Sequence, residues 1–242
     1  MAGNKSKILV LVEGAKTDVR LMEHLLNIYG ISEKHTIVPY YTNIYTLYNE
    51  MFRDNNPDEI DLRQLLKERE QDPEKKLIFD ENYSDILLIF DLDPHAPDFS
   101  ADKIREMSEY FNESSDMGKL YINYPMVEAF YHMNSIPDME YYSRYATIEE
   151  LQAKEYKQRV NRENRNHDYS KFAVDKAECN IVIRQNIDKG FLLCGIDDPQ
   201  VPLPDSAEIL SVQLDTIEKE QRMAVLCTCA FYIVDYNPKL IE

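Results

Sequence analysis

Positive charge is scarce in this chain of 242 residues, which has 27 lysines and arginines against 44 aspartates and glutamates. The formal net charge is −17. A protein this acidic repels phosphate backbones at long range, and a nucleic-acid-binding protein that works alone with high affinity usually carries a basic surface. The composition therefore argues against that class. It leaves open a site at which metal ions neutralise the charge locally.

Long hydrophobic runs and zinc-spaced cysteines are also lacking. The polar, basic residues 1–7 precede an apolar run that is too short for the core of a signal peptide or for a transmembrane helix. None of the four cysteines pairs with zinc-ligand spacing. Cys227 and Cys229 lie in a run that looks helical, so their thiols are expected on different faces. Free cysteines without an export signal favour the cytoplasm and no membrane partner.

An alternation of strand and helix patterns fills residues 1–134. Continuous aliphatic runs predict strands buried on both faces, as in a parallel sheet, at 7–12, 85–90 and 120–123. A proline marks 36–41 as an edge strand. Apolar spacing predicts the intervening helices at 18–29 with Thr17 as N-cap, 44–52, 62–66, 101–111 and a short helix opened by Pro125.

The second half follows a different pattern. Residues 150–171 are polar and locally basic, and apolar residues recur at helical spacing from residue 175 onward. This spacing predicts two or three helices, the last over 206–234. We therefore expect an α/β domain with a mostly parallel sheet flanked by helices over residues 1–134, and a helical C-terminal region over residues 135–242.

Three acidic residues directly follow the predicted core strands. Glu13 comes after the first strand, and Asp91 and Asp93 come after the strand at 85–90. Ligands bind beyond the carboxyl ends of parallel strands. If residues 91–93 are extended, both aspartates lie on one side, where they repel unless a divalent cation such as Mg²⁺ binds between them. Any one of these acids taken alone could instead be a helix N-cap or a solvated loop residue.

The segments that carry these acids resemble motifs of the Toprim family. Residues 12–18 (VEGAKTD) resemble its first motif and residues 89–93 (IFDLD) its second. The family occurs in primases, type II topoisomerases, recombination proteins and nucleases of the OLD and stand-alone RloB-like groups. The resemblance covers about residues 7–134. It implies that Glu13 serves as acid/base or metal ligand and that Asp91 and Asp93 hold a divalent metal.

A third element matches more loosely. RloB-like proteins have Asn-Pro-x-x-Glu at the head of a helix, and residues 123–128 contain an extra residue between Asn and Pro. Glu128 is then another metal ligand, or an acid that the helix dipole favours. His132, one turn on, is a candidate general acid or phosphate contact, or a packed histidine. Lys16 is a candidate phosphate ligand or an exposed lysine. Asp18 resembles an acid of the first motif, or is an early-helix acid at the positive end of the helix dipole.

The basic stretch that begins at residue 154 is the candidate nucleic-acid contact. The residues assigned to it are Lys154, Lys157, Arg159, Arg162 and Arg165. Tyr156 and Tyr169 lie among them and could stack on bases. Acidic residues are interspersed, so a solvated helix face of mixed charge is the alternative.

The resemblance implies a Mg²⁺- or Mn²⁺-dependent endonuclease, a hydrolase acting on DNA or RNA, tRNA included, as an anti-phage defence effector. OLD-type nucleases often work with an ATPase. This sequence has no Gly-x-x-x-x-Gly-Lys-Ser/Thr, so the ATPase would be a partner protein. The alternative is a catalytically silent, Toprim-like binding or regulatory subunit. Three clustered carboxylates cost stability without metal, which favours the enzyme. The last helix, with Leu210 and Leu214, is either a homodimer interface or core.

Overall fold

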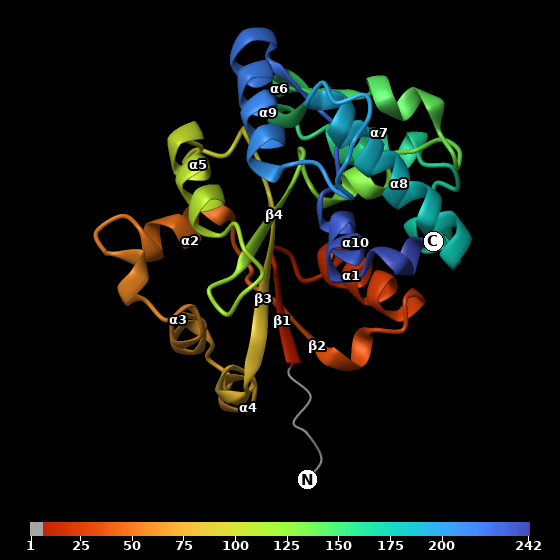
Figure 1. Cartoon of the computed structure of the whole chain (residues 1–242). Coiled ribbons are helices and arrows are strands. Elements are labelled where there is room, and N and C mark those ends of the chain that lie inside the picture. The colour runs from red at the N-terminus through yellow and green to blue at the C-terminus, as the bar shows by residue number, and fades with distance from the viewer. Residues whose placement is uncertain (1–6) are drawn as a thin grey trace.

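A parallel sheet forms the centre of the computed structural model, which describes residues 7–242 (Figure 1). The strand order is β2-β1-β3-β4. The strands are β1 (Lys7–Val12), β2 (His35–Pro39), β3 (Tyr83–Asp91) and β4 (Lys119–Asn123). Each neighbouring pair is parallel. The predicted α/β fold is confirmed, and β2 lies at the edge as its proline indicated.

Helices cover both faces of this sheet. The helices in its first half are α1 (Thr17–Ile28), α2 (Ile44–Met51), α3 (Leu62–Arg69), α4 (Pro73–Lys76) and α5 (Ala101–Tyr110), with 3₁₀ turns η1 (Ser32–Lys34), η2 (Pro57–Glu59) and η3 (Leu77–Asp80). Figure 1 places α2, α3 and α5 on one side of the sheet and α1 on the other. Thr17 is the first residue of α1 and not its N-cap. Lys16 takes the N-cap position without a side-chain hydrogen bond.

The C-terminal region is mostly helical but contains a small two-stranded sheet. Its helices are α6 (Ile148–Gln152), α7 (Tyr156–Glu163), α8 (Lys176–Leu193), α9 (Ser206–Glu220) and α10 (Tyr232–Tyr236). Its 3₁₀ turns are η5 (Met139–Ser143), η6 (Tyr169–Lys171), η7 (Cys229–Phe231) and η8 (Pro238–Ile241), and η4 (Val127–Tyr131) leads into it from β4. Strands β5 (Tyr145–Thr147) and β6 (Arg222–Ala224) pair antiparallel.

The single helix predicted over 206–234 is wrong. Helix α9 ends at Glu220, Gln221 adopts a left-handed conformation with φ 52°, and the chain turns into β6. The apolar run that follows is buried at every residue from Met223 to Cys227. A continuously buried run has no polar face, so helical spacing cannot distinguish it from a strand.

The cysteine pair also departs from its prediction. Because Cys227 and Cys229 do not lie in one helix, their thiols do not point apart; the two Sγ atoms are 3.3 Å from each other. Both residues are buried and free of disulfide bonds.

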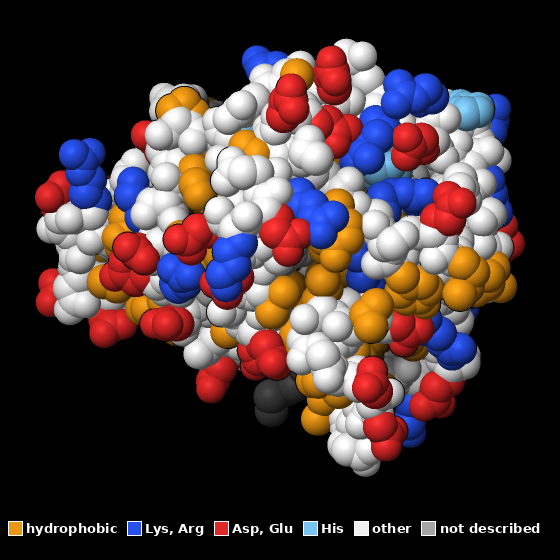
Figure 2. Space-filling model, turned by 90° about the horizontal axis from the view of Figure 1, so that it is seen from above, with side chains coloured by type: hydrophobic (Ala, Val, Ile, Leu, Met, Phe, Trp, Pro, Cys, Tyr) orange, Lys and Arg blue, Asp and Glu red, His pale blue; other side chains and the backbone are white. Residues whose placement is uncertain are grey.

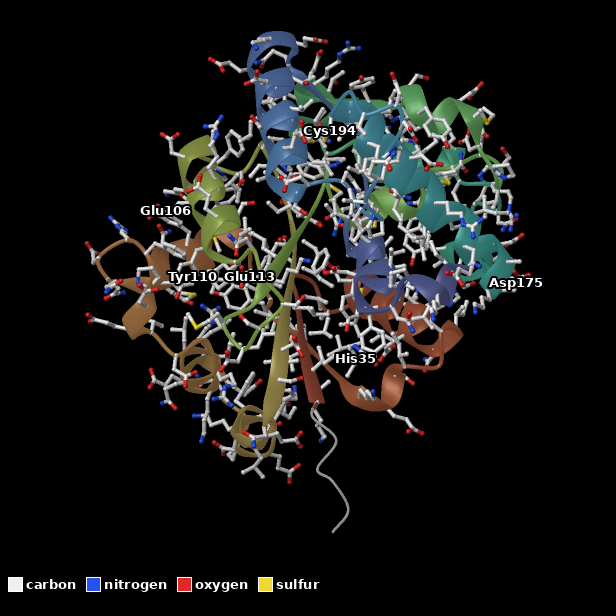
Figure 3. The ribbon with its side chains drawn as sticks, in the orientation of Figure 1. His35, Glu106, Tyr110, Glu113, Asp175 and Cys194 are labelled. Carbon is white, nitrogen blue, oxygen red and sulfur yellow. The ribbon has the colours of Figure 1, made fainter. Side chains whose placement is uncertain are left out.

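Residues near the C-terminus close the outer edge of β4. The backbone groups of Tyr124 and Leu226 exchange two hydrogen bonds of 2.8 Å. The Thr228 hydroxyl donates to the Ile122 carbonyl at 2.7 Å. At the opposite edge of the sheet, His35 at the start of β2, labelled in Figure 3, hydrogen-bonds the Tyr232 hydroxyl of α10 at 2.6 Å. One continuous hydrophobic core therefore joins the two halves of the chain.

Within residues 7–242, no helix combines the length and the apolar character needed to cross a membrane.

Candidate functional site

The carboxyl ends of three neighbouring strands bring polar side chains together. Glu13 follows β1, Asp91 ends β3 and Asn123 ends β4 in register with Asp91. The backbone N–H of Asp91 donates to Glu13 Oε2 at 3.2 Å. The side-chain amide of Asn123 donates to Asp91 Oδ1 at 3.4 Å. This is the edge at which open parallel sheets bind ligands.

Asp93 reaches the same place through a turn. Its φ of 43° is left-handed, so residues 91–93 are not the extended segment that period-two alternation requires. Aspartate tolerates this conformation better than most residues. The Tyr45 hydroxyl donates to the Leu92 carbonyl and steadies the turn, and His95 Nδ1 lies 3.7 Å from the Asp93 carboxylate.

Asp18 joins the cluster from the first turn of α1. The residue is 7% exposed, and its Oδ1 is buried with no hydrogen-bond partner. A Cβ atom at Gly14 would lie only 2.6 Å from Asp18 Oδ2. A side chain at residue 14 would therefore force the Asp18 carboxylate to move.

Glu128 completes the set from η4 and meets a cation from the C-terminal region. Its side chain is 4% exposed, with Oε1 3.1 Å from Nζ of Lys157 on α7. Its Oε2 is buried and has no hydrogen-bond partner. Glu128 and Asp18 thus each hold one carboxylate oxygen away from both water and protein donors.

Burial and mutual repulsion raise the proton affinity of the cluster. Burial, reinforced by the charges of Asp93 and Asp18, raises the pKa of Glu13 to about 8. Burial and the charge of Glu13 raise the pKa of Asp91 well above its usual range. Burial, with a further contribution from Glu128, raises the pKa of Asp18 to about 6. Burial also raises the pKa of Asp93.

Lys157 counteracts the rise in pKa of the clustered carboxylates. Its positive charge lowers the pKa of Glu13, Asp18 and Asp93 relative to what burial alone would give. Burial of its own side chain disfavours the ammonium, but Glu128, Asp91 and Asp18 together outweigh burial, and the pKa of Lys157 lies above its ordinary value. A residue assigned from sequence to nucleic-acid contact is therefore part of the acidic cluster.

The donor set fits a hard divalent cation. Carboxylate oxygens are the ligands of Mg²⁺, and the unpartnered oxygens of Asp18 and Glu128 lack a positive partner. As the side chains stand, no group of three or more His, Cys, Asp or Glu residues in 7–242 is arranged around one metal position. Two of the carboxylates already have protein partners: Glu13 accepts a hydrogen bond from the Asp91 backbone, and Glu128 pairs with Lys157.

The structure does not bring His132 and Lys16 into this cluster through any described contact. His132 is fully buried; its Nδ1 lies 3.1 Å from the Tyr156 hydroxyl and its Nε2 2.8 Å from Glu163 Oε2. Burial, with the nearby arginines, lowers the pKa of His132 to about 2. The packed alternative therefore describes it better than general acid catalysis. Lys16 is exposed at the start of α1.

Two of the other four predicted nucleic-acid contacts are already paired with carboxylates. Arg159 lies 2.8 Å from Glu150, and Arg165 donates to both oxygens of Glu178 at 2.7 and 2.9 Å. Lys154 and Arg162 remain exposed. Figure 2 shows acidic and basic side chains interspersed over the upper face.

Neither tyrosine of the basic stretch is placed to stack on a base. Tyr156 is buried, with 1% of the residue exposed. Tyr169 stacks on Tyr131 with ring centroids 4.2 Å apart.

An open groove of about 700 Å³ lies beside α7, and the clustered carboxylates do not line it. Arg162 and Glu163 line it, whereas Lys157 near the start of the same helix reaches the acidic cluster. Helix α7 therefore connects the groove to the cluster.

Comparison of the chain with protein-family models, with curated proteins and with solved structures found no match.

Sequence patterns alone did not indicate two further contributions to the site. Tyr45 orients the turn at Leu92, and Lys157 reaches the cluster from the other half of the chain. A tyrosine in an amphipathic helix and a lysine in a basic stretch carry no local signal for either role.

Proposed function

We propose that this chain is a Toprim-like, Mg²⁺- or Mn²⁺-dependent endonuclease that hydrolyses phosphodiester bonds in DNA or RNA. We further propose that it is an anti-phage defence effector working with a partner ATPase. These last two features come from the resemblance of residues 12–18 and 89–93 to the Toprim motifs. The observation that carries the proposal is the convergence of five carboxylates, with two buried oxygens left unpartnered.

The energetics of the cluster favour a cation ligand. Carboxylates removed from water cost free energy unless they are paired, and Lys157 supplies one positive charge for five acids. Near neutral pH the metal-free site keeps a proton on Glu13, because burial raises its pKa to about 8, and burial also raises the pKa of Asp91. A divalent cation would replace that proton.

Each carboxylate has a proposed role in the reaction. Asp91, Asp93 and Glu128 would hold the metal, with Glu13 as a further ligand. A bound divalent ion neutralises charge on the phosphate and makes bound water more acidic. With the metal bound, Glu13 would be in its charged form and available as a general base toward water.

The alternative function is a catalytically silent binding or regulatory subunit. Two observations favour it: one oxygen of Glu128 is already paired with Lys157, and the carboxylates as they stand do not surround one metal position. Metal binding and cleavage must therefore be measured separately.

A cleavage assay with matched variants tests the proposal. Wild type, Glu13→Gln and Asp91→Asn would be incubated with plasmid, single-stranded DNA and total tRNA in Mg²⁺, Mn²⁺ or EDTA. The control is Asp85→Asn, a change near the opposite end of the strand that carries Asp91. We expect metal-dependent cutting in wild type and control, and at least a hundredfold loss in the two site variants.

The melting temperature distinguishes the alternatives. If Mn²⁺ raises it in wild type but not in Asp91→Asn, and no substrate is cut with or without an added ATPase partner, the silent subunit is the better description. If Mn²⁺ affects neither protein, the metal site is refuted.

A further inference from the structure

Lys157 reaches a buried carboxylate while remaining open to solvent. Its Nζ lies 3.1 Å from Glu128 Oε1, and the lysine side chain is 59% exposed whereas that of Glu128 is 4% exposed. The backbone of Lys157 is fixed because the adjacent Tyr156 and the later Val160 anchor α7 in the core. The flexible stem can therefore change the position of the ammonium group without moving the helix.

The ammonium acts as the counterion of the acidic cluster. Besides its contact with Glu128, it favours the charged forms of Glu13, Asp18 and Asp93. A divalent cation among the same carboxylates carries twice the charge and seeks the same oxygens. Metal and ammonium therefore compete for Glu128, and like charges at close range repel.

We propose that Lys157 and the metal ion exchange at Glu128, and that the displaced ammonium binds a phosphate of the substrate strand. This inference rests on the proposed nuclease function, because it requires the metal site. In the metal-free protein Lys157 neutralises Glu128 and is not available to nucleic acid. In the metal-loaded protein the same lysine is freed beside the metal, where a phosphodiester must bind.

The surroundings of α7 are consistent with a phosphate as the new partner of Lys157. Arg162 follows five residues later, about 7–8 Å along the helix axis, is exposed and lines the open groove. Residues five apart lie about 140° apart around a helix, so a strand would meet both Lys157 and Arg162 only by crossing over α7. An exchange of this kind would let a protein of net charge −17 bind nucleic acid only after metal loading.

The test compares metal affinity and strand affinity in the same variants. Lys157→Ala and Lys157→Gln remove the charge, and the glutamine keeps much of the stem. The matched control is Lys219→Ala, because Lys219 pairs with Asp215 at 2.8 Å and is 68% exposed. Mn²⁺ affinity would be measured by titration calorimetry. Binding of a labelled single-stranded oligonucleotide would be measured by fluorescence anisotropy, with Ca²⁺ to limit cleavage and with EDTA.

Exchange predicts opposite effects on the two ligands. Both Lys157 variants should bind Mn²⁺ about two- to fivefold more tightly than wild type, as expected for loss of a competing, partly exposed ion pair. Both should bind the oligonucleotide at least about tenfold more weakly in Ca²⁺, yet match wild type in EDTA. Lys219→Ala should match wild type throughout.

Three other outcomes would overturn the proposed exchange. Unchanged or weaker Mn²⁺ binding by both Lys157 variants would overturn the exchange while leaving the metal site intact. An equal loss of oligonucleotide affinity in Ca²⁺ and in EDTA would make Lys157 an ordinary surface contact and also overturn it. If wild type binds no Mn²⁺ at all, the metal site itself fails, and the exchange fails with it.

Discussion

Replacing Glu13 with glutamine should stabilise the metal-free protein at alkaline pH. Folding raises the pKa of Glu13 from its ordinary value of 4.5 to about 8. Between these values the folded state keeps a proton that the unfolded chain has released, so the free energy of unfolding falls as pH rises. At about 1.4 kcal/mol per pKa unit the full shift corresponds to roughly 5 kcal/mol. The partial exposure of Glu13 and its coupling to the other acids reduce this to about 2–4 kcal/mol.

The variant Glu13→Gln cannot develop this charge. In EDTA at pH 8 it should exceed wild type in stability by about 2–4 kcal/mol, or roughly 5–12 °C in melting temperature for a chain of this size. At pH 5 most of the difference should disappear, because Glu13 of the folded wild type is protonated there. Saturating Mn²⁺ at pH 8 should reduce or reverse the difference, since only wild type keeps the full ligand set.

Thermal unfolding followed by circular dichroism at pH 5 and pH 8 checks this reasoning. Asp85→Asn is the control, and its difference from wild type should not show the same increase between the two pH values. The reasoning is refuted if Glu13→Gln is less stable than wild type at pH 8 in EDTA, or if the difference between them is the same at both pH values.

Three further predictions follow from the geometry. Gly14→Ala should destabilise the protein by about 1–3 kcal/mol and weaken Mn²⁺ binding, because its Cβ would lie 2.6 Å from Asp18 Oδ2; unchanged Mn²⁺ affinity in calorimetry would count against Asp18 as part of the site. His132, with a pKa of about 2, should show no ring-proton titration by NMR between pH 5 and 8, whereas a midpoint above pH 5 would restore it as a general acid candidate. In the native protein, at most one thiol, that of Cys194, should react with a thiol reagent at pH 8, and it should react slowly because burial raises its pKa to about 11. All four thiols should react in denaturant. Fast labelling of more than one native thiol would contradict the packing.

The sheet and the placement of its acids were accessible from the sequence because both depend on local patterns. Unbroken aliphatic runs identify β1 and β3, and the residue that follows a parallel strand must lie at its carboxyl end. These two local patterns were sufficient to predict that Glu13 and Asp91 lie close together. The backbone conformation that places Asp93 beside them could not be predicted from sequence, because its left-handed turn depends on tertiary hydrogen bonds at Leu92.

The C-terminal half was harder to predict for a physical reason. The run from Met223 to Cys227 is buried on every side, so its hydrophobicity has no period from which strand and helix can be told apart. Lys157 illustrates the same limit for function. Its charge was visible in the sequence, but its partner Glu128 was set by how α7 packs on η4.

The contact between Cys229 and Asn123 has a consequence for the time at which the site is completed during protein synthesis. The N–H of Cys229 donates to Asn123 Oδ1 across 106 residues, and the amide of Asn123 in turn donates to Asp91. At about 5–20 residues per second, the ribosome adds Cys229 roughly 5–20 s after Asn123. A growing chain therefore contains all five acids well before it contains the segment that closes β4. Any catalytic competence that depends on this closure is delayed until that segment has been synthesised.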